Sequence, residues 1–205
     1  PQKNLFSHII GQIDNDNNGI SGLEKSLDEN LKNRQKPIQS TLDQDVQFLI
    51  RNELVKFNQI FKTLGSAAIL MDVNNGEILS LVSLPDFDPN RREKINDLNL
   101  INRATKGVYE FGSVFKTFTL AAALHEKLIE PHTEFIDLPK TLTCAGFPIR
   151  EYDMEIPSNL TAEQILIRSG NIGSVRIGQK IGEEKFKKFL SKIDVLEKTN
   201  FDIEE

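Results

Sequence analysis

The stretch 109–124 constrains the fold of this chain more than any other. A glycine stands directly before Ser113, and the residues that follow favour helix, so a helix is predicted to begin at the serine. Lys116 lies three residues further on, and residues at i and i+3 share a helix face, so its ammonium can return toward the Ser113 oxygen. Because Phe115 and Phe118 provide an apolar setting that disfavours the charged form, the lysine can act as a base for a serine nucleophile.

A second polar motif lies between two helical patterns further along the chain. Ser169 and Asn171 form an S-x-N in a predicted loop, and this motif and the S-x-x-K each occur once. Serine and asparagine also favour helix boundaries, so a purely structural explanation of these two residues stays open.

Together these motifs resemble the transpeptidase domain of the penicillin-binding proteins, most closely the class B, division-type enzymes. The segments 22–28, 37–43 and 65–89 look like that family in the same order, so the resemblance covers nearly the whole chain. There are two departures. Phe111 stands where the family often has proline, and no Lys-Thr-Gly follows Asn171.

The resemblance implies the α/β (α+β) fold of the penicillin-binding and serine β-lactamase-like transpeptidases, with a helix-flanked, mainly antiparallel sheet. Residues 1–36 would be the C-terminal tail of an N-terminal pedestal domain, and residues 37–205 the N-terminal portion of the transpeptidase domain, truncated before the Lys-Thr-Gly strand. Because the sheet would then be incomplete, with an open strand edge, self-association of the chain is expected.

The implied activity is a D,D-transpeptidase that cross-links peptidoglycan stem peptides ending in D-Ala-D-Ala and is acylated by β-lactams. Ser113 would attack the carbonyl and supply one oxyanion donor from its N–H, and Lys116 would accept the hydroxyl proton. Ser169 would relay that proton, and Asn171 would bind the substrate amide or hold Lys116. The Lys-Thr-Gly strand supplies a second oxyanion donor in the family, and loss of one donor costs about 10²–10³-fold, so we expect little or no turnover from this chain.

Two other functions stay open at this stage. One is a non-catalytic scaffold for division or elongation proteins, and the other is a D,D-carboxypeptidase or serine β-lactamase of the same fold. The resemblance also implies a location on the periplasmic side of the inner membrane, with an anchor outside the chain. It leaves open whether the protein takes part in cell division or in synthesis of the side wall.

Composition excludes other classes of function. The net charge is −5 and the pI about 5.4, so there is no basic footprint for nucleic acid. No apolar run approaches the roughly 18 residues of a membrane helix. No cofactor is expected, and no metal site either, since the calcium-like loop at 14–25 has lysine where a bidentate glutamate is needed. The one cysteine, Cys144, cannot form an internal disulfide.

The remaining patterns predict the secondary structure. Capping boxes are expected at Ser21 and Thr161, the first opening one helix with Leu23, Leu27 and Leu31 on one stripe. A long amphipathic helix is predicted over 43–64. A hairpin over 67–82 turns at Asn-Gly, and both its faces are expected to be covered because its strands are apolar. Short strands are expected over 129–159. Helices over 172–181 and beyond follow, the last with four apolar residues facing inward: Phe186, Phe189, Leu190 and Ile193.

Overall fold

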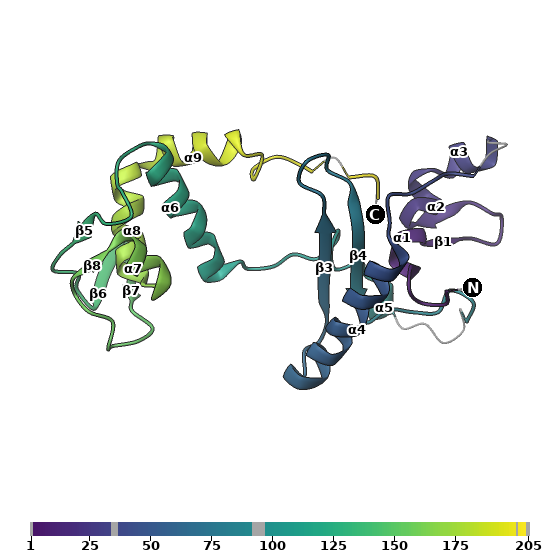
Figure 1. The fold of residues 1–205 in the computed structure, drawn as a ribbon, viewed down its shortest axis with the longest axis horizontal. Coiled ribbons are helices and arrows are strands. Elements are labelled where there is room, and N and C mark those ends of the chain that lie inside the picture. The colour runs from purple at the N-terminus through teal and green to yellow at the C-terminus, as the bar shows by residue number, and fades with distance from the viewer. Residues whose placement is uncertain (1, 34–36, 92–96, 200, 204–205) are drawn as a thin grey trace. The chain divides into compact units, whose positions relative to one another are not determined.

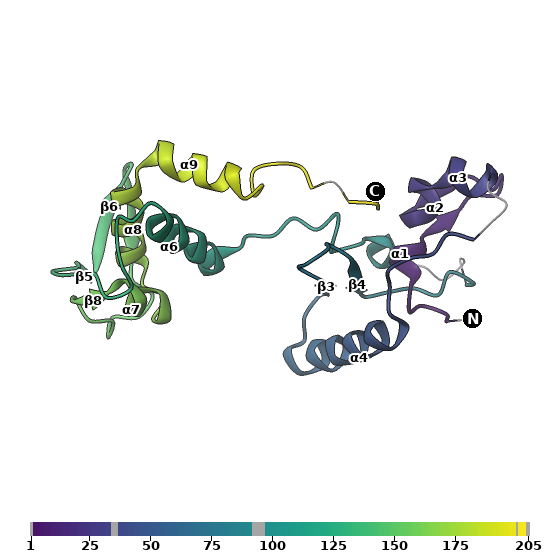
Figure 2. The ribbon, with the colours of Figure 1, turned by 45° about the horizontal axis from the view of Figure 1, so that its top comes forward.

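The computed structural model describes residues 2–33, 37–91, 97–199 and 201–203, which fold as two compact units (Figures 1 and 2). Unit 1 consists of Pro1–Tyr109 with Asn200–Glu205, and unit 2 consists of Glu110–Thr199. Each unit has its own cluster of buried apolar side chains, so each is described by itself.

Unit 1 is built on a hairpin with a long helix packed against it (Figure 1). The helix is α4 (Gln44–Phe61), and the hairpin pairs β3 (Ser66–Met71) with β4 (Ile78–Leu84) in antiparallel register. Asp43 caps α4, because its carboxylate accepts the first free N–H groups of the helix. Lys62, in the left-handed region, ends it. The predicted helix and hairpin are confirmed.

The two strands of the hairpin differ in burial. Residues 80–84 of β4 are all buried, whereas Ile69, Leu70 and Met71 of β3 are largely exposed. The expectation that both faces of the hairpin are covered is therefore wrong for β3. Apolar composition alone cannot tell a covered strand from one whose partner lies elsewhere.

A buried glutamine joins α4 to β4. Gln47 is 1% exposed, and its Nε2 donates to the carbonyls of Leu5 and Leu81 at 3.0 and 2.8 Å. Its Oε1 accepts from Ser80 Oγ at 2.7 Å and from the Leu81 N–H at 3.0 Å. All the hydrogen-bonding capacity of the amide is used, so its burial carries no desolvation penalty from an unpaired group.

Short elements make up the rest of unit 1. The predicted capping box at Ser21 is wrong, because no side-chain bond caps the helix there. Ser21 has the extended backbone usual for a cap residue, but Gly22 follows with φ of +61°, outside the right-handed helical range, so the chain does not enter the helix with the geometry of a capping box. The expected single helix is also divided, into α2 and α3. These elements are α1 (Ser7–Ile10), β1 (Gln12–Ile13), β2 (Gly19–Ser21), α2 (Gly22–Ser26), α3 (Asp28–Asn33) and α5 (Asp97–Leu100).

The calcium-like loop is a polar turn held by its own hydrogen bonds. Asp14 Oδ1 accepts from the N–H groups of Asp16 and Asn18 at 2.9 and 2.8 Å. The Lys32 ammonium bonds to Asn18 Oδ1 at 2.8 Å. These oxygens, which would be cation ligands, serve the turn and an ammonium group instead.

Unit 2 is a cluster of four helices with two small antiparallel strand pairs (Figure 1). β5 pairs with β8, and β6 with β7, in agreement with the short strands expected over 129–159 and with an α+β fold. The elements are η2 (Gly112–Phe115), α6 (Lys116–His125), β5 (Glu134–Phe135), β6 (Thr141–Cys144), β7 (Phe147–Arg150), β8 (Leu160–Thr161), α7 (Ala162–Ile167), α8 (Asn171–Ile181) and α9 (Glu183–Lys192).

Close packing of helices forms the core of unit 2. Both views of the ribbon show α6 beside α8 (Figures 1 and 2). Ala122 and Ala123 of α6 are fully buried. A Cβ on Gly173 of α8 would come within 2.6 Å of the Ile165 side chain, so α7 and α8 approach each other as only glycine permits. The relative position of the segments that carry Ser169 and Asn171 is thereby set by the core.

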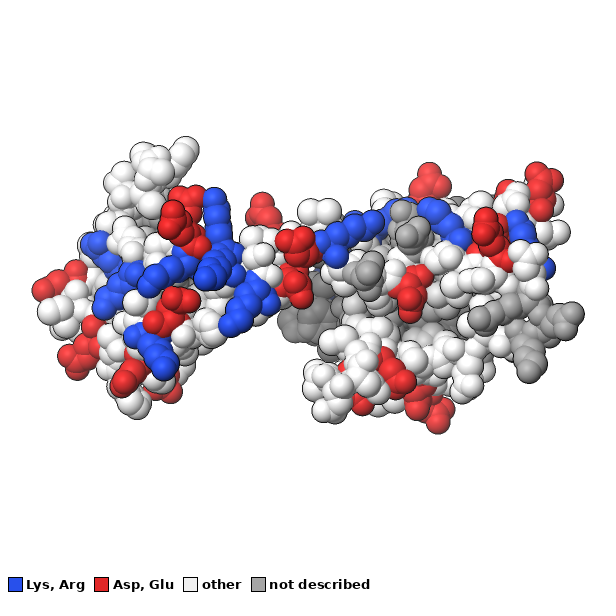
Figure 3. Space-filling view, turned by 90° about the horizontal axis from the view of Figure 1, so that it is seen from above, with Lys and Arg blue, Asp and Glu red and all other residues white. Residues whose placement is uncertain are grey.

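The last helix has one apolar and one charged face. Phe189 and Leu190 are buried, as expected, but Ile193 is 42% exposed, so its predicted inward position is wrong. Ile193 lies just past the end of α9, where the helical spacing that predicted its direction no longer applies. In Figure 3, Lys and Arg side chains gather beside Asp and Glu over this unit, and the lysines of α9 lie on its exposed face.

Candidate active site

The Ser113 turn is a short 3-10 helix that runs directly into α6. The serine is exposed, and the α-helix itself begins three residues later, at Lys116. Gly112 adopts φ of +54°, a conformation that favours glycine and that turns the chain into the helix. The prediction that a helix begins at the serine is confirmed in this form. The hydroxyl lies at the positive end of the helix, where the first N–H groups have no intrahelical acceptor.

Lys116 joins the two motifs. Its Nζ donates to the Ser169 carbonyl at 2.6 Å, to Ser169 Oγ at 3.1 Å and to Asn171 Oδ1 at 2.5 Å. An ammonium has three donors, and three acceptors lie within reach of it. In the part of the chain that the structure describes, no hydrogen bond joins Lys116 to Ser113. The lysine thus contacts the S-x-N loop and does not return to the serine of its own motif.

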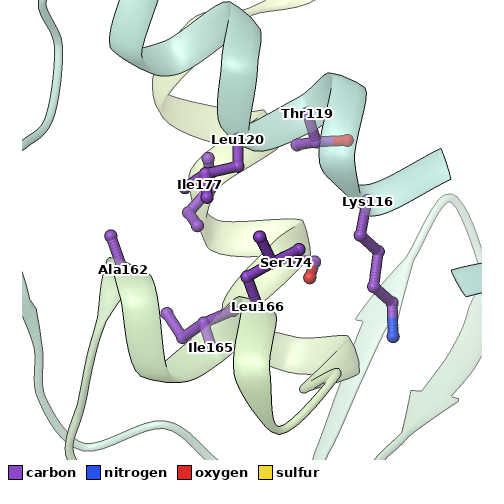
Figure 4. Close-up of a pocket in the computed structure, with 8 residues that line it drawn as sticks. All are labelled: Lys116, Thr119, Leu120, Ala162, Ile165, Leu166, Ser174 and Ile177. Carbon is purple, nitrogen blue, oxygen red and sulfur yellow. The ribbon is translucent and has the colours of Figure 1, made fainter. Parts of the chain in front are cut away.

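The setting of Lys116 lowers its proton affinity. Figure 4 shows its side chain leaving the start of α6, with the nitrogen at the far end from that helix. The stem borders a tightly packed junction of α6, α7 and α8 that includes Leu120, Leu166 and Ile177. Burial lowers the pKa of Lys116 below its ordinary value, and the negative charge of Glu151 partly opposes that change. The amine is therefore easier to deprotonate than a surface lysine.

Ser169 occupies the position that most often carries glycine at the end of a helix. After α7, its N–H bonds to the Leu166 carbonyl at 2.9 Å, and the N–H of Gly170 bonds to the Ile165 carbonyl at 2.9 Å. These two bonds form a Schellman motif, whose terminal residue is left-handed. Ser169 has φ of +51°, which is strained for a residue with a Cβ. The strained backbone presents the carbonyl and the hydroxyl of Ser169 to the same ammonium.

Asn171 is the first residue of α8, and three bonds hold it. Its side-chain Nδ2 donates to the Arg150 carbonyl at 2.7 Å, which leaves Oδ1 facing Lys116. Its backbone N–H donates to Glu151 Oε2 at 2.7 Å. The amide orientation therefore follows from its two partners, a carbonyl acceptor and an ammonium donor.

Glu151 was missed by sequence reasoning. Glu151 is 8% exposed, and its carboxylate accepts from the first two N–H groups of α8. The sequence offers only a weak signal for it, an acid just after the apolar Ile149 of a short strand. Its importance depends on where the strand end meets α8, twenty residues later along the chain.

The structure thus brings together Lys116, Ser169 and Asn171, and places Ser113 on the turn that precedes Lys116. Chemically, this is an exposed hydroxyl at a helix start, next to a partly buried amine held by neutral oxygens. Such a set of groups is suited to nucleophilic attack by serine with lysine as base.

Within the described ranges, no group of three or more His, Cys, Asp or Glu side chains is arranged to hold a metal ion. Nor is any described helix long and apolar enough to span a membrane.

Comparison with known proteins gives consistent matches. A family model for the penicillin binding protein transpeptidase domain matches residues 66–205. The chain is 27% identical, over 97% of its length, to the "Probable peptidoglycan D,D-transpeptidase FtsI" of Caulobacter vibrioides, of which it covers 34%.

Solved structures share the fold. The apo-form of penicillin binding protein 3 from Mycobacterium tuberculosis matches with a TM-score of 0.87 at 25% identity, over 99% of this chain and 48% of that one. Its complex with ampicillin matches with a TM-score of 0.81 at 26% identity, over 94% of this chain and 45% of that one. The chain spans about a third of the curated relative and about half of the solved chains.

Proposed function

The chain belongs to the penicillin-binding protein transpeptidase family, and from this membership we propose that it is part of a peptidoglycan D,D-transpeptidase of the class B, division type. The observation that carries the proposal is the bonding of the Lys116 ammonium to both Ser169 and Asn171, directly after the Ser113 turn. Lys116, whose proton affinity is lowered by burial, then contacts a candidate proton relay and follows a candidate nucleophile by three residues.

In the proposed reaction, Ser113 Oγ attacks the carbonyl carbon of a D-alanyl-D-alanine peptide bond. Lys116, in its neutral form, takes the hydroxyl proton, and a positioned base of this kind contributes roughly 10²–10⁴-fold to the rate. Ser169 Oγ relays a proton to the leaving D-alanine amine, which departs and leaves a serine ester. The amine of a second stem peptide then attacks this ester, and the cross-link forms as Ser113 regains its proton.

The proposed substrates are peptidoglycan stem peptides, with β-lactams as acylating inhibitors. The Caulobacter relative is named as a peptidoglycan D,D-transpeptidase, and one related structure is a complex with ampicillin. A β-lactam ring offers the same kind of carbonyl to Ser113, and ring opening leaves the antibiotic attached to the serine as an ester.

We place the catalytic domain on the periplasmic side of the membrane, among division or elongation proteins. Residues 1–36 would belong to the pedestal domain and residues 37–205 to the transpeptidase domain. Self-association of the 205-residue chain is a further proposal, supported by exposed apolar side chains on β3 and α4 such as Ile69 and Phe61. A monomeric mass by light scattering at high concentration contradicts it.

The proposal is tested by intact-protein mass after incubation with a penicillin. We expect the full-length protein to gain the mass of one ring-opened antibiotic and its Ser113→Ala variant to gain none. The same comparison on the 205-residue chain asks whether these residues suffice for acylation. Because Ser113 is exposed, the variant should keep the thermal stability of the parent protein. A full-length parent that stays unmodified, or a variant that is acylated equally, overturns the serine mechanism and favours a non-catalytic scaffold.

A further inference from the structure

We propose that Glu151 is a positioning residue of this site, whose buried carboxylate orders the start of α8 and, through Asn171, locates the Lys116 ammonium. The proposal rests on the proposed function for its kinetic consequences. Its structural part depends only on contacts within unit 2.

The carboxylate bonds to two consecutive N–H groups at the start of α8. Oε2 accepts from Asn171 at 2.7 Å, and Oε1 accepts from Ile172 at 2.9 Å. The first N–H groups of a helix have no acceptor inside it, and they form its positive end. A buried, doubly bonded carboxylate satisfies both groups and suits that charge, and such charge-assisted bonds are strong.

The residue before Glu151 holds the side chain of the same asparagine. The Arg150 carbonyl accepts from Asn171 Nδ2 at 2.7 Å. Two consecutive residues, Arg150 at the end of β7 and Glu151 directly after it, therefore bind both the amide and the backbone of Asn171. The amide cannot rotate without losing a bond, so Oδ1 is presented to Lys116 Nζ, 2.5 Å away. The end of β7 is thereby linked to the lysine through a single side chain.

Glu151 also acts on Lys116 by its charge. Among the salt bridges of the described residues, none joins these two side chains, so the carboxylate acts across a longer distance. Burial lowers the pKa of Lys116, and the Glu151 charge raises it. Removing that charge should lower the pKa further and favour the neutral amine at a given pH.

Several other charged groups of the helices packed on α6 have partners of their own. Arg176 of α8 bonds to Gln179, and Lys185 of α9 pairs with Glu126. Glu163 of α7 faces His132, and η2 carries no charged side chain. Two further contacts on α9 are Lys192 with His125 and Lys187 with Glu183. Among the described residues, Glu151 is the charged group that shifts the pKa of Lys116.

Two variants separate the effect of side-chain length from the effect of charge. Glu151→Asp keeps the charge but is one methylene too short to bond to both N–H groups. Glu151→Gln keeps the length but removes the charge and can offer only one acceptor to the two N–H groups. Glu155→Gln is the matched control, because Glu155 is an exposed acid four residues away.

The experiment measures the rate of acylation by a fluorescent penicillin from pH 5 to pH 10, on the full-length protein and the three variants. For Glu151→Gln we expect the plateau rate to fall about tenfold, and the rise of rate with pH to shift to lower pH by roughly half a unit to one unit. For Glu151→Asp we expect the same pH midpoint as the parent, with a plateau roughly threefold to tenfold lower. Glu155→Gln should match the parent.

A second readout does not depend on acylation. The Lys116 side chain is titrated by NMR in lysine-labelled chain, with a Lys116→Met sample to assign its signal. A midpoint lowered by Glu151→Gln but not by Glu155→Gln supports the proposal even if the parent is never acylated, which would count only against the proposed function.

Parental plateau rates in Glu151→Asp, or a Lys116 midpoint unmoved in a folded Glu151→Gln, overturn the positioning proposal. If Glu151→Gln does not fold, the plateau rate of Glu151→Asp decides alone. A plain helix cap would lower the stability of both variants and leave the pH midpoint of Lys116 where it is.

Discussion

The Ser113 turn and the loop from Ser169 to Asn171 are two serine-bearing segments of unit 2 that are held very differently. The turn is exposed, and in the described chain its serine side chain makes no hydrogen bond. The loop is bounded by a Schellman motif and by the buried carboxylate of Glu151, and it accepts three bonds from Lys116.

The difference fits the two separate roles that the proposed mechanism gives to these segments. In the proposed mechanism, the groups that would transfer protons are pre-organised, because a base works only when its geometry and its proton affinity are both set. The proposed nucleophile, Ser113, is accessible on a single turn. Substitutions in the loop should therefore change both the acylation rate and the stability, whereas substitutions in the turn should change the acylation rate alone.

After the loss of Ser113 itself, the largest effect is expected from Lys116→Met, which replaces the proposed base with an apolar chain of similar length. Acylation by penicillin should fall by roughly 10²–10⁴-fold, because among the described residues no other amine bonds to Ser169 or Asn171. The measurement is the rate of mass gain, with the exposed Lys188→Met as control. A loss of less than about threefold in a folded variant would remove Lys116 from the mechanism.

A smaller effect on acylation, together with an effect on stability, is expected from two substitutions at Ser169. Both Ser169→Ala and Ser169→Gly remove the hydroxyl, and we expect acylation to fall by about 10–100-fold in each. Only glycine relieves the left-handed strain, so Ser169→Gly should be more stable than Ser169→Ala by about 1 kcal/mol in urea unfolding.

The Ser169 pair distinguishes two reasons for the serine. Equal stability of the two variants would mean that the positive φ at this residue carries no measurable strain. Acylation preserved in both would mean that the hydroxyl relays no proton and that the residue serves through its backbone carbonyl.

The smallest effect is expected at the start of α7, the helix that leads to the loop. Thr161 and Gln164 form a reciprocal capping box, so Thr161→Ala should lower the free energy of unfolding by about 1 kcal/mol. Ser21→Ala is the matched control in unit 1, where the serine makes no cap bond, and it should change stability by less than about 0.5 kcal/mol. Equal losses in urea unfolding would show that the cap bond has no energetic value.

Much of the fold could be predicted because its signals are local. The Asn-Gly turn, the cap of the helix after Thr161 and the helical spacing of apolar residues each depend on a few neighbouring side chains. Ser21 matched the same capping pattern and failed. The difference is that Gly22 adopts a positive φ, which packing imposes and sequence spacing cannot express.

The candidate site could be predicted only as far as its motifs extend. Ser113, Lys116, Ser169 and Asn171 were identified as residues, and their catalytic roles remain predictions. Helical spacing relates Lys116 to Ser113 and contains nothing about a loop from another helix, so a contact between Lys116 and Asn171 was expected only from the resemblance. Glu151 was missed for the same reason, since its effect arises from a contact between a strand end and a helix start.

Asn171 is held by a backbone carbonyl on one side and by a carboxylate on the other, and the two supports come from neighbouring residues. The bond from Arg150 uses its main chain, so it survives almost any side chain at that position. The bond from Glu151 uses its side chain, so it requires an acid of the right length. Positions 150 and 151 should therefore differ sharply in the substitutions that they tolerate. Most side chains should be accepted at position 150, whereas position 151 should accept few.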